Sequence, residues 1–515
     1  MNKGKVYLVG AGPGDPALIT VKGRQILENA DVVVYDNLAT PLLLACVNHQ
    51  AKLIYVGKKS GKHTMDQASI SKLLVELAKE GLNVVRLKGG DPFIFGRGGE
   101  EAQTLFEHNI EFEIIPGVTS AAAVPAYAGI PLTHRQYASI VTFLTGHEDP
   151  KKVDSGIPWS RIPVSGTIVI LMGVANIRKI KERLLENGMS YKTPFAIICN
   201  GTLPDQDIVE GKLIEMDIIA KKRGVKPPAI IIIGNVVNLR KELLWFEKKP
   251  LFGKRILITR PREQIDEIMS LLTDMGAFCI PFSTISIVPP DKWDLCDSAI
   301  ANIKNYNWII FTSKNGVKFF FSRFHELGND IRDLKGIKIG AIGPKTAQAL
   351  KDMYININFV PKEYRAEGIV SYISNIEIKG KRFLLPRAEK ARDYLPTKLE
   401  QMGAEVDIVP VYKNVLPNIH GDYIEYVKKM FLNKDIHIAV FTSPSTFQNF
   451  LKLMNIDEDI EKIRDFLNGT KIACIGPVTG NVIEKTGLSI NIMPERYTVS
   501  NLVDSIVKDC KKYFA

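Results

Sequence analysis

The sequence predicts an α/β protein whose two halves each contain two lobes. Short apolar runs alternate with amphipathic stretches along the whole chain, the pattern restarts after a charged segment at 247–252, and the second half contains an internal repeat. Alternation of this kind favours largely parallel sheets with helices on their faces. At about 150 residues for each compact unit, the 515 residues allow three or four such lobes.

The first half, residues 1–246, contains a series of apolar runs with helical stretches between them. We expect a lobe boundary near Pro116-Gly117, which gives lobes of about 1–116 and 117–246. Helices are predicted at Leu18–Asn29, Met65–Glu80 and Ala175–Asn187. Strands are predicted at Lys5–Gly10, Asp31–Tyr35, Lys52–Val56, Asn83–Leu87, Phe112–Ile115, Thr167–Met172, Phe195–Cys199 and Ala229–Ile233.

The second half, residues 253–515, follows the linker 247–252, which is charged and contains a proline. A long surface loop within one domain is the alternative interpretation of this linker. The string Phe-Thr-Ser occurs at 311–313 and 441–443, and an Ile-Gly-Pro-x-Thr string follows each copy, at 342–346 and 475–479. Two copies of a strand–turn–helix unit predict two similar α/β lobes with a ligand cleft between them. A stacked solenoid would need more copies.

Composition excludes several classes of protein. No window approaches 18 consecutive apolar residues, so we expect no membrane-spanning helix. The apolar run near the N-terminus is too short for a secretory signal, which predicts a cytoplasmic protein. The six cysteines form no C-x-x-C pair, and none lies near a histidine at zinc-ligand spacing. We therefore expect reduced thiols and no metal site.

The net charge of +11 favours anionic partners. Nucleic acid is one candidate, but the chain has no run of basic residues with interleaved aromatic residues and no known nucleic-acid-binding module. Scattered positive charge suits a small polycarboxylate better. We therefore expect such a substrate, with no nucleic-acid and no membrane partner.

Two glycine-rich turns in the first half point to a ligand site. The first, Gly10–Asp15, follows a strand and precedes a helix, and an exposed turn of this kind offers unpaired backbone N–H groups. A dinucleotide-binding G-x-G-x-x-G fingerprint would need glycine where Asp15 stands, and Pro13 removes one backbone donor. A tight turn without a ligand is the alternative.

The second turn contains five glycines between positions 89 and 99. Glycine in a helix interior costs roughly 0.5–1 kcal/mol, so this density indicates a pocket lined by backbone. Asp91 can accept hydrogen bonds from a ribose or an ammonium group. Positive charge close by comes from Arg86, Lys88 and Arg97.

The turns resemble those of the tetrapyrrole methylase family, in particular its uroporphyrinogen-III C-methyltransferase branch. The resemblance covers the whole first half in order. The strings that carry it are Gly10–Asp15, Val85–Glu100, Pro116–Ala121, Gly129–Arg135, Thr145–His147, Val169–Gly173 and Asn200–Thr202.

This resemblance implies that S-adenosylmethionine binds where two α/β lobes meet. Asp36, directly after a strand, corresponds to the family's candidate proton acceptor, and Lys58 corresponds to its candidate proton donor. A turn cap and a solvated lysine are the alternative roles of these two residues. The S-adenosylmethionine contacts would come from Pro13, Gly89, Gly90, Asp91, Ile94, Thr119, Ser120, Met172 and Gly201.

The implied reaction is double C-methylation of uroporphyrinogen III to precorrin-1 and then precorrin-2. A pyrrole carbon attacks the sulfonium methyl and the thioether leaves neutral, so alignment dominates the barrier. A carboxylate such as Asp36 can then accept the proton that leaves the macrocycle. The resemblance also implies a homodimer, and precorrin-2 leads either to sirohaem or to cobalamin.

The second half resembles uroporphyrinogen-III synthase. The implied reaction closes hydroxymethylbilane to uroporphyrinogen III with inversion of ring D, through an azafulvenium and a spiro intermediate. Because the bilane alone cyclises without inversion, the protein must hold one folded substrate shape. The strings that carry the resemblance are Thr259–Pro261, Phe311–Ser313, Ile342–Thr346, Leu385–Asp393, Val411–Tyr412, Phe441–Ser443 and Ile475–Thr479.

The resemblance assigns Tyr412 as the candidate proton donor to the leaving hydroxyl, and a sheet tyrosine without a catalytic role is the alternative. Turn hydroxyls suit a polycarboxylate, and arginine binds carboxylates bidentately. The candidate substrate-binding residues are Arg260, Ser313, Thr346, Arg387, Arg392, Ser443 and Thr479. For the serines and threonines, a role as helix N-cap is the alternative.

Two other functions stay open. One is a methyltransferase whose second half is a non-catalytic regulatory or binding domain. The other is a nicotinamide-dependent oxidoreductase with a periplasmic-type binding domain. Asp15 in the fingerprint and the missing export signal count against this second alternative.

Overall fold

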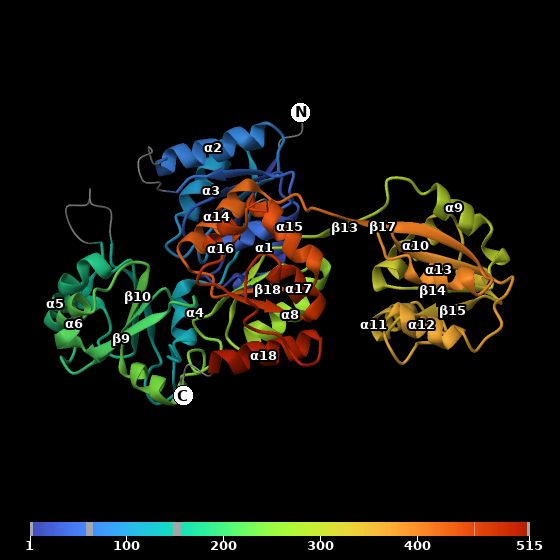
Figure 1. Cartoon of the computed structure of the whole chain (residues 1–515). Coiled ribbons are helices and arrows are strands. Elements are labelled where there is room, and N and C mark those ends of the chain that lie inside the picture. Colours follow the sequence, from blue (N-terminus) through green and yellow to red (C-terminus); the bar gives the residue numbers. More distant parts are fainter. Residues whose placement is uncertain (1–3, 58–64, 148–155, 458, 512–515) are drawn as a thin grey trace. The chain divides into compact units, whose positions relative to one another are not determined.

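The computed structural model describes residues 4–57, 65–147, 156–457 and 459–511. The chain forms two compact units, whose elements are labelled in Figure 1. Unit 1 comprises Met1–Thr284 together with Asn418–Ala515, and unit 2 comprises Ile285–Pro417. The sequence of unit 2 is therefore an insertion in that of unit 1.

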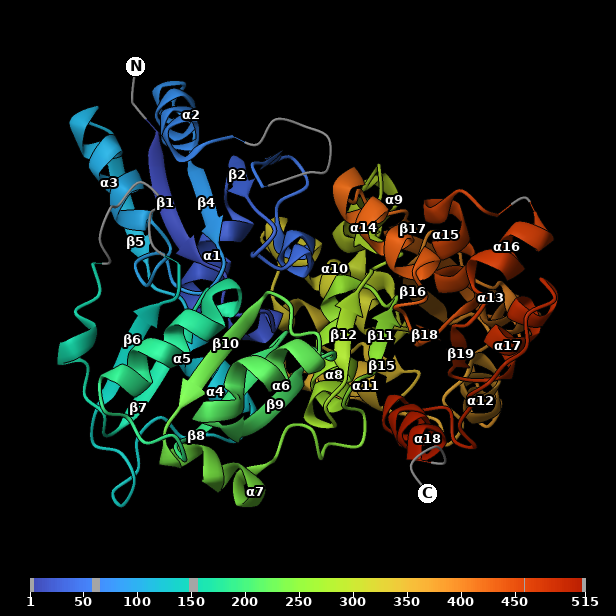
Figure 2. The same cartoon turned by 90° about the vertical axis from the view of Figure 1, so that its left-hand side faces the viewer.

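The first sheet of unit 1 is parallel throughout, with the order β3-β2-β4-β1-β5 (Figure 2). All residues of β2 and β4 are buried. Because the strands are parallel, their carboxyl ends lie along one edge, where ligands bind in open α/β sheets. The elements are β1 (Lys5–Gly10), β2 (Val32–Tyr35), β3 (Lys52–Tyr55), β4 (Val84–Lys88), β5 (Glu111–Ile115), α1 (Val21–Glu28), α2 (Gln67–Lys79) and α3 (Gly98–Glu107).

The second sheet of unit 1 has the order β6-β7-β10-β8-β9 and is mostly antiparallel. β6 and β7 pair in parallel, whereas the other three pairs are antiparallel, so the expectation of largely parallel sheets is wrong here. The elements are β6 (Val141–Thr145), β7 (Thr167–Leu171), β8 (Pro194–Cys199), β9 (Asp207–Lys212), β10 (Ala229–Ile233), α4 (Ser120–Tyr127), α5 (Ile177–Glu186) and α6 (Met216–Lys222).

The apolar pattern does not predict the two outer strands of this sheet. β6 has no buried residue, and in β9 the buried residue is Val209. Both strands lie at the edges of the sheet. Edge strands bury little apolar surface, so their sequences lack the apolar runs that identify central strands.

The remaining strands form two sheets that share one strand order. In unit 1 the order is β12-β11-β18-β19, with all pairs parallel. In unit 2 the order is β13-β17-β16-β14-β15, and β13 alone in this sheet pairs antiparallel. The strands are β11 (Arg255–Ile258), β12 (Phe278–Pro281), β13 (Ser286–Val288), β14 (Trp308–Phe311), β15 (Lys338–Ala341), β16 (Arg382–Ala388), β17 (Glu405–Val415), β18 (Ile438–Phe441) and β19 (Lys471–Cys474).

The internal repeat of the sequence maps onto this shared order. β18 and β14 occupy equivalent places, and they lead into α15 (Pro444–Met454) and α10 (Lys314–Glu326). β19 and β15 are also equivalent, and they lead into α17 (Pro477–Glu484) and α11 (Pro344–Lys351). β11 and β16 then correspond as well, which makes Arg260 and Arg387 equivalent residues five positions after Arg255 and Arg382. The domain boundaries at 116–117 and 247–252 stay predictions.

Within the described ranges, no helix is long and apolar enough to cross a membrane. The same ranges hold no group of three or more His, Cys, Asp or Glu side chains placed to bind a metal ion. The six cysteines are free thiols.

Candidate functional site

Three glycines from three segments meet at the carboxyl end of the first sheet. Gly10 ends β1, Gly90 follows β4 and Gly117 follows β5. A Cβ atom added to Gly117 would lie 2.2 Å from the Gly90 carbonyl oxygen, and one added to Gly10 would lie 2.4 Å from the Gly117 Cα. The Gly90 N–H also donates to the Gly12 carbonyl at 2.7 Å. Only glycine fits these contacts, which accounts for much of the glycine density in the sequence.

Asp91 joins the glycine-rich loop to the turn after β5. Its Oδ1 accepts hydrogen bonds from the Phe93 N–H at 2.8 Å and the Ile94 N–H at 3.1 Å. Its Oδ2 accepts a hydrogen bond from the Gly117 N–H at 2.9 Å. The carboxylate therefore orders the backbone of the site, and a bond to a ligand would use its remaining lone pairs.

Strained backbone gathers in the loops that follow β4, β7 and β8. Five of the nine described non-glycine residues with positive φ lie there: Phe95, Arg97, Met172, Asn200 and Thr202. Such residues cost of order 1–3 kcal/mol each and cluster at functional sites. The predicted contact residues Ile94 and Gly201 are neighbours of these strained positions, and Met172 is one of them.

Thr202 connects the loop after β8 with the turn after β1. Its Oγ1 accepts a hydrogen bond from the Asp15 N–H at 3.1 Å, and a Cβ on Gly14 would lie 2.9 Å from the same oxygen. Gly201 lies against α4, where a Cβ would be 2.3 Å from Val124 Cγ1. The structure thus brings the turn that contains Pro13 close to the loop that contains Gly201.

Thr119 and Ser120 begin α4 beside the glycine turn. Thr119 is the N-cap residue, and its Oγ1 accepts a hydrogen bond from the Ala121 N–H at 3.3 Å. A Cβ on Gly90 would lie 3.6 Å from the Ser120 nitrogen. Met172 follows β7 and is 50% exposed. Two strand spacings, about 10 Å, separate the end of β7 from that of β8.

Asp15 has a structural role that the fingerprint alone does not reveal. Its carboxylate accepts hydrogen bonds from the Tyr127 hydroxyl at 2.8 Å and from the Ala17 N–H at 2.9 Å. Burial and this acidic partner raise the pKa of Tyr127. The turn is thereby tied to α4, and it presents a carboxylate where a dinucleotide fold receives pyrophosphate.

Asp36 lies just beyond β2, where Arg86 of β4 holds it. Arg86 NH2 donates to Asp36 Oδ2 at 2.8 Å, and the Leu38 N–H donates to Asp36 Oδ1 at 3.0 Å. The Asp36 side chain is 25% exposed, whereas that of Arg86 is 4% exposed, so solvent reaches the carboxylate and not the guanidinium. Lys58, the predicted proton donor, lies outside the described residues.

Behind Arg86 lies a buried carboxylate that the motifs do not identify. Glu101 of α3 is fully buried and accepts hydrogen bonds from Lys88 Nζ at 2.9 Å, Arg86 Nε at 3.3 Å and Gln67 Nε2 at 2.9 Å. Burial lowers the pKa of Lys88, and Arg86 adds to this effect while Glu101 opposes it. The sequence does contain one indication of such a carboxylate. Arg86 and Lys88 stand at alternate positions of an apolar strand, and two buried cations need a partner of opposite charge.

The carboxyl edge of the first sheet suits a small ligand with both polar and apolar parts. Glycines let the turns after β1, β4 and β5 approach one another closely, and the loop tip exposes apolar surface at Phe93, Ile94 and Phe95. Apolar surface with a few placed polar groups is typical of small-molecule sites. The residues present therefore fit S-adenosylmethionine.

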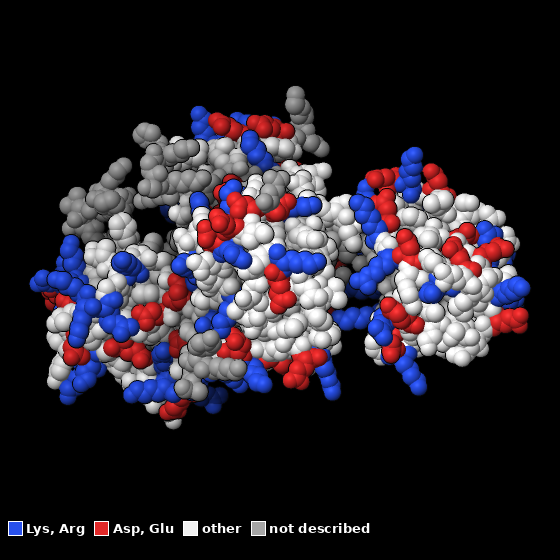
Figure 3. Space-filling model, in the orientation of Figure 1, with Lys and Arg blue, Asp and Glu red and all other residues white. Residues whose placement is uncertain are grey.

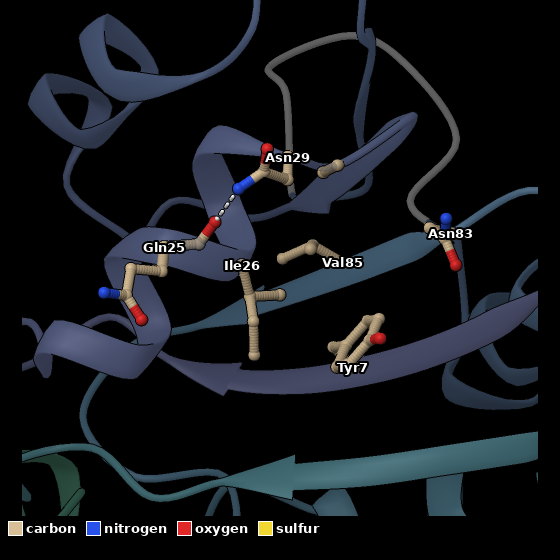
Figure 4. Close-up of a pocket in the computed structure, with 7 residues that line it drawn as sticks. Tyr7, Gln25, Ile26, Asn29, Asn83 and Val85 are labelled. Atoms are coloured by element: carbon tan, nitrogen blue, oxygen red, sulfur yellow. Dashed lines mark hydrogen bonds between the residues drawn. The ribbon is translucent and has the colours of Figure 1, made fainter.

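A separate cavity of about 280 Å³ lies between α1 and the first sheet (Figure 4). Tyr7 and Val85, which pair across β1 and β4, line it together with Asn29 of the α1 C-terminus and Asn83. Asn83 precedes β4, whereas the glycine turn follows that strand. The cavity is therefore distinct from the candidate site.

In unit 2, Tyr412 and Ser313 are hydrogen-bonded neighbours. The Tyr412 Oη and the Ser313 Oγ lie 3.1 Å apart. Ser313 is also the N-cap of α10, because its Oγ accepts a hydrogen bond from the Gly316 N–H at 2.9 Å. Burial raises the pKa of Tyr412, so the phenol is protonated at neutral pH.

Arg387 lies beside this pair, since the next residue, Ala388, is in register with Tyr412. Its NH1 donates to the Arg392 carbonyl at 2.9 Å, and its NH2 donates to Asp393 Oδ1 at 2.6 Å. The Arg392 side chain is exposed. Thr346 is buried at the third position of α11, whose N-cap is Gly343.

The other three candidate residues of the second half belong to unit 1. Arg260 NH2 donates to Gln264 Oε1 at 2.9 Å. Ser443 is the N-cap of α15, and Thr479 is buried at the third position of α17, after the N-cap Gly476. Both serines are therefore helix N-caps, whereas neither threonine is. The ligand cleft between the lobes stays a prediction.

Arg260 and Arg387 share an unusual feature. Four buried side-chain nitrogen or oxygen atoms in the described residues lack a hydrogen-bond partner, and three of them belong to these arginines: Arg260 Nε, Arg260 NH1 and Arg387 Nε. Burial lowers the pKa of Arg260. A buried donor without a partner costs about 1–3 kcal/mol, so an acceptor from a ligand is the simplest explanation.

Charges of both signs are mixed on the visible surface. On the face shown in Figure 3, lysine and arginine alternate with aspartate and glutamate. The cations of the candidate sites, Arg86, Lys88, Arg260 and Arg387, instead have side chains that are at most 12% exposed.

Two family models match the chain. Residues 5–217 match the model described as tetrapyrrole (corrin/porphyrin) methylases. Residues 266–504 match the model described as uroporphyrinogen-III synthase HemD. The two matches fall on the two halves that the sequence predicts.

The relatives agree with this division. The porphyrin biosynthesis protein HemD of Ruminiclostridium josui is 36% identical over 509 residues, which cover 99% of this chain and 98% of the relative. The S-adenosyl-L-methionine-dependent uroporphyrinogen III methyltransferase of Methanosarcina barkeri is 54% identical over 239 residues, which cover 46% of this chain and 94% of the relative.

Solved structures also align with each half. The uroporphyrin-III C-methyl transferase of Thermus thermophilus, complexed with S-adenosyl homocysteine, is 39% identical with a TM-score of 0.40, covering 46% of this chain and 94% of that one. A mutant uroporphyrinogen III synthase from the same organism is 16% identical with a TM-score of 0.38, covering 50% and 99%.

Proposed function

The chain belongs to the tetrapyrrole methylase family in its first half and to the uroporphyrinogen-III synthase family in its second, and we propose that it converts hydroxymethylbilane to precorrin-2. The second half closes the bilane to uroporphyrinogen III with inversion of ring D. The first half then methylates this product twice, through precorrin-1. The product of one half is thus the substrate of the other.

For methylation, the supporting observation is that the glycine-built edge lies against the Asp36 segment. A Cβ on Gly89 would lie 2.6 Å from Leu38 Cβ, two residues beyond Asp36. S-adenosylmethionine supplies the activated methyl group. The backbone of the glycine turns and the side chain of Met172 orient this methyl toward a pyrrole carbon. Further contacts come from Pro13, Gly89, Gly90, Asp91, Ile94, Thr119, Ser120 and Gly201.

Asp36 accepts the proton that leaves the macrocycle after each methylation. Its two oxygens are oriented by Arg86 and by the Leu38 N–H, and each oxygen keeps a lone pair for the substrate. Its partial exposure gives the substrate access. Lys58 stays the proposed proton donor on the strength of the family resemblance.

In the second half, Tyr412 donates its proton to the departing hydroxyl of the bilane. The C–O bond breaks, water leaves, and the resulting azafulvenium is attacked within the folded substrate. The Ser313 hydroxyl, 3.1 Å from the phenol oxygen, supports this role, because it holds the phenol in one orientation. Carboxylates of the substrate bind at Arg260, Arg387 and Arg392, with Ser313, Thr346, Ser443 and Thr479 at the adjoining helix starts.

The methylation claim is tested with Asp36→Asn in the full chain. The amide keeps a hydrogen bond to Arg86 but cannot take the proton, so precorrin-2 formation from uroporphyrinogen III should fall by about 10²- to 10⁴-fold. Asp66→Asn, at the N-cap of α2, is the matched control and should keep the wild-type rate. Wild-type turnover by Asp36→Asn would remove Asp36 from the mechanism.

Ligand choice is tested by equilibrium dialysis. S-adenosylmethionine should bind the chain and NAD should not, because Asp15 and Pro13 occupy the phosphate turn of the dinucleotide fingerprint. Binding of NAD with no binding of S-adenosylmethionine would favour the oxidoreductase alternative.

The synthase claim is tested with hydroxymethylbilane as sole substrate. Oxidation and isomer analysis of the product should give the inverted type III isomer. The non-inverted isomer alone would favour the other candidate, a methyltransferase with a non-catalytic second half. The donors of Arg260 and Arg387 that lack a hydrogen-bond partner support an anionic ligand in the second half.

We propose a cytoplasmic homodimer formed through the methyltransferase half, which acts on small tetrapyrrole polycarboxylates and needs no metal. A gel-filtration mass near that of one 57.4 kDa chain would contradict the dimer. Precorrin-2 would enter sirohaem or cobalamin synthesis.

A further inference from the structure

We propose that Glu101 is a positioning residue for methyl transfer, which holds Asp36 in its working orientation by fixing Arg86. The inference rests on the proposed role of Asp36 as proton acceptor. It concerns a residue that never meets the substrate, since the Glu101 side chain is 0% exposed.

Two buried cations create the need for Glu101. Arg86 and Lys88 stand at alternate positions of β4, so their side chains leave the same face of the sheet. Both side chains are at most 5% exposed. Buried charges must be paired, and Glu101 is the carboxylate within reach of both. Asp36 supplies the second negative charge, which balances the cluster.

The geometry makes Arg86 the link between the two carboxylates. Its Nε donates to Glu101 Oε1 at 3.3 Å, and its NH2 donates to Asp36 Oδ2 at 2.8 Å. Its NH1 donates to the Leu87 carbonyl at 3.0 Å. Because the guanidinium is a rigid plane, holding Nε and NH1 sets the direction of NH2. Glu101 therefore anchors the inner end of a chain whose outer end is Asp36.

Glu101 also has a structural role. A test must distinguish this role from the positioning of Asp36. Lys88 precedes the glycine-rich loop, and Glu101 lies at the fourth position of α3, which follows that loop. The Lys88–Glu101 ion pair thus joins the two ends of the loop. Removing Glu101 alone would leave two cations against one carboxylate, and the chain could fail to fold.

The double variant Lys88→Met/Glu101→Gln separates these duties in the full chain. It removes one buried charge of each sign, so the cluster stays balanced and the fold survives. The Arg86–Asp36 pair remains, but its anchor weakens, because the bond from Arg86 Nε to a carboxylate becomes a bond to a neutral amide oxygen. We expect kcat for methylation of uroporphyrinogen III to fall about 10- to 100-fold, since a misplacement near 1 Å has that effect. KM and the Kd of S-adenosylhomocysteine, measured by calorimetry, should stay near the wild-type values.

The matched control is Lys72→Met/Glu76→Gln. This pair also carries one charge of each sign, lies on α2 of the same lobe and is exposed. It should leave kcat unchanged. A second route, should the buried double variant melt without cooperativity, is Glu101→Asp. It keeps the charge, shortens the side chain by one methylene, and should lower kcat about tenfold with unchanged Kd.

The decisive comparison adds Asp36→Asn to the double variant. If Glu101 acts through Asp36, the triple variant is no slower than Asp36→Asn alone. Multiplied losses would overturn the positioning role while leaving Asp36 as the proton acceptor. A wild-type rate for Asp36→Asn would instead overturn the proposed base, and the role of Glu101 would fall with it. An unchanged kcat in Lys88→Met/Glu101→Gln would overturn the positioning role by itself.

Discussion

The Ser313 Oγ and the Tyr412 Oη lie 3.1 Å apart at the start of α10 in unit 2. Ser313 Oγ is already fixed by the Gly316 N–H, so it orients the phenol against the sheet. The equivalent serine in the other lobe, Ser443, bonds instead to Ser445 at 3.1 Å. Both copies of the repeat therefore begin a helix with a serine N-cap, and in unit 2 this serine also contacts the proposed proton donor.

Tyr412→Phe should remove the proposed proton donor while the fold is kept. The ring still stacks on Phe319, so the fold is kept, but the phenol is lost. We expect the enzymatic rate to fall by about 10²-fold and the non-inverted isomer to accumulate, because unprocessed bilane cyclises unaided. Product isomer analysis after oxidation measures both effects.

A second buried phenol gives the control for that variant. The Tyr306 hydroxyl donates to Asp407 at 2.6 Å in the same unit. Tyr306→Phe should lower the Tm and leave the isomer ratio at the wild-type value. Equal isomer ratios in Tyr412→Phe and wild type would mean that Tyr412 is a structural tyrosine.

Arg260→Met should weaken substrate binding without weakening the fold. Two nitrogens of this guanidinium have no hydrogen-bond partner among the described residues, and NH1 lies as far as 4.0 Å from Glu267 Oε2, so little native bonding is lost with them. A charged hydrogen bond to a substrate carboxylate contributes about 1.5–3 kcal/mol, so KM for hydroxymethylbilane should rise about 10- to 100-fold. Thermal unfolding should show an unchanged or higher Tm.

Arg323→Met should behave in the opposite way. Arg323 donates to both oxygens of Asp297 at 2.7 Å, so its removal breaks a bidentate pair. We expect a lower Tm and an unchanged KM. If Arg260→Met matched this pattern, Arg260 would be a structural arginine rather than a carboxylate site.

Gly117→Ala should disrupt the glycine-built edge. The added Cβ would lie 2.2 Å from the Gly90 carbonyl, so the turns after β4 and β5 must separate. Binding of S-adenosylhomocysteine, measured by calorimetry, should weaken at least about tenfold, which is about 1.4 kcal/mol. Retained wild-type affinity would show that these turns do not form the binding edge.

Gly99→Ala, in the glycine-rich segment 89–99, provides the control. No atom lies within 4 Å of the added Cβ, and Gly99 is the second residue of α3. Alanine favours a helix over glycine by up to about 1 kcal/mol. The variant should therefore be at least as stable as wild type in denaturant unfolding and should bind S-adenosylhomocysteine normally.

His437 should make the stability of unit 1 depend on pH. Its Nδ1 accepts a hydrogen bond from the Arg255 N–H at 2.9 Å, so the imidazole is neutral in the folded state. Burial lowers the pKa of His437 below its usual 6.5, and Lys254 and Arg255 lower it further. Above pH 6.5 the residue is neutral in both states and contributes no pH dependence.

Below that pH the unfolded chain takes up the proton first, so stability falls until the lower folded-state pKa is passed. His437→Gln should flatten the fall in Tm over this window relative to wild type. A parallel pH dependence of Tm in the two proteins would exclude His437 as the cause.

The central strands could be predicted because burial on both faces leaves an apolar run in the sequence. All residues of β4 and of β7 are buried, and both strands were expected close to their observed bounds. β6 and β9, at the sheet edges, have no such run. The antiparallel direction of β10 could not be predicted either, because the apolar pattern of a strand is the same in both directions.

The candidate site was predictable where it depends on local sequence. Glycine turns, the strand end before Asp36 and the serine caps of α10 and α15 all follow from neighbouring residues. Glu101 could not be found in this way. A glutamate in the first turn of a helix has the same local pattern whether it is solvated or buried, and its burial depends on Arg86 and Lys88 across the sheet.

The sequence by itself determined the α/β class, the repeat and the family of each half, because these depend on the periods of strands and helices and on short motifs. The tertiary structure decided which charges are paired: it ties Arg86 to two carboxylates, and among the described residues it leaves three donor nitrogens of Arg260 and Arg387 without a hydrogen-bond partner. Charge pairing depends on contacts between segments far apart in the chain, and no local pattern contains that information.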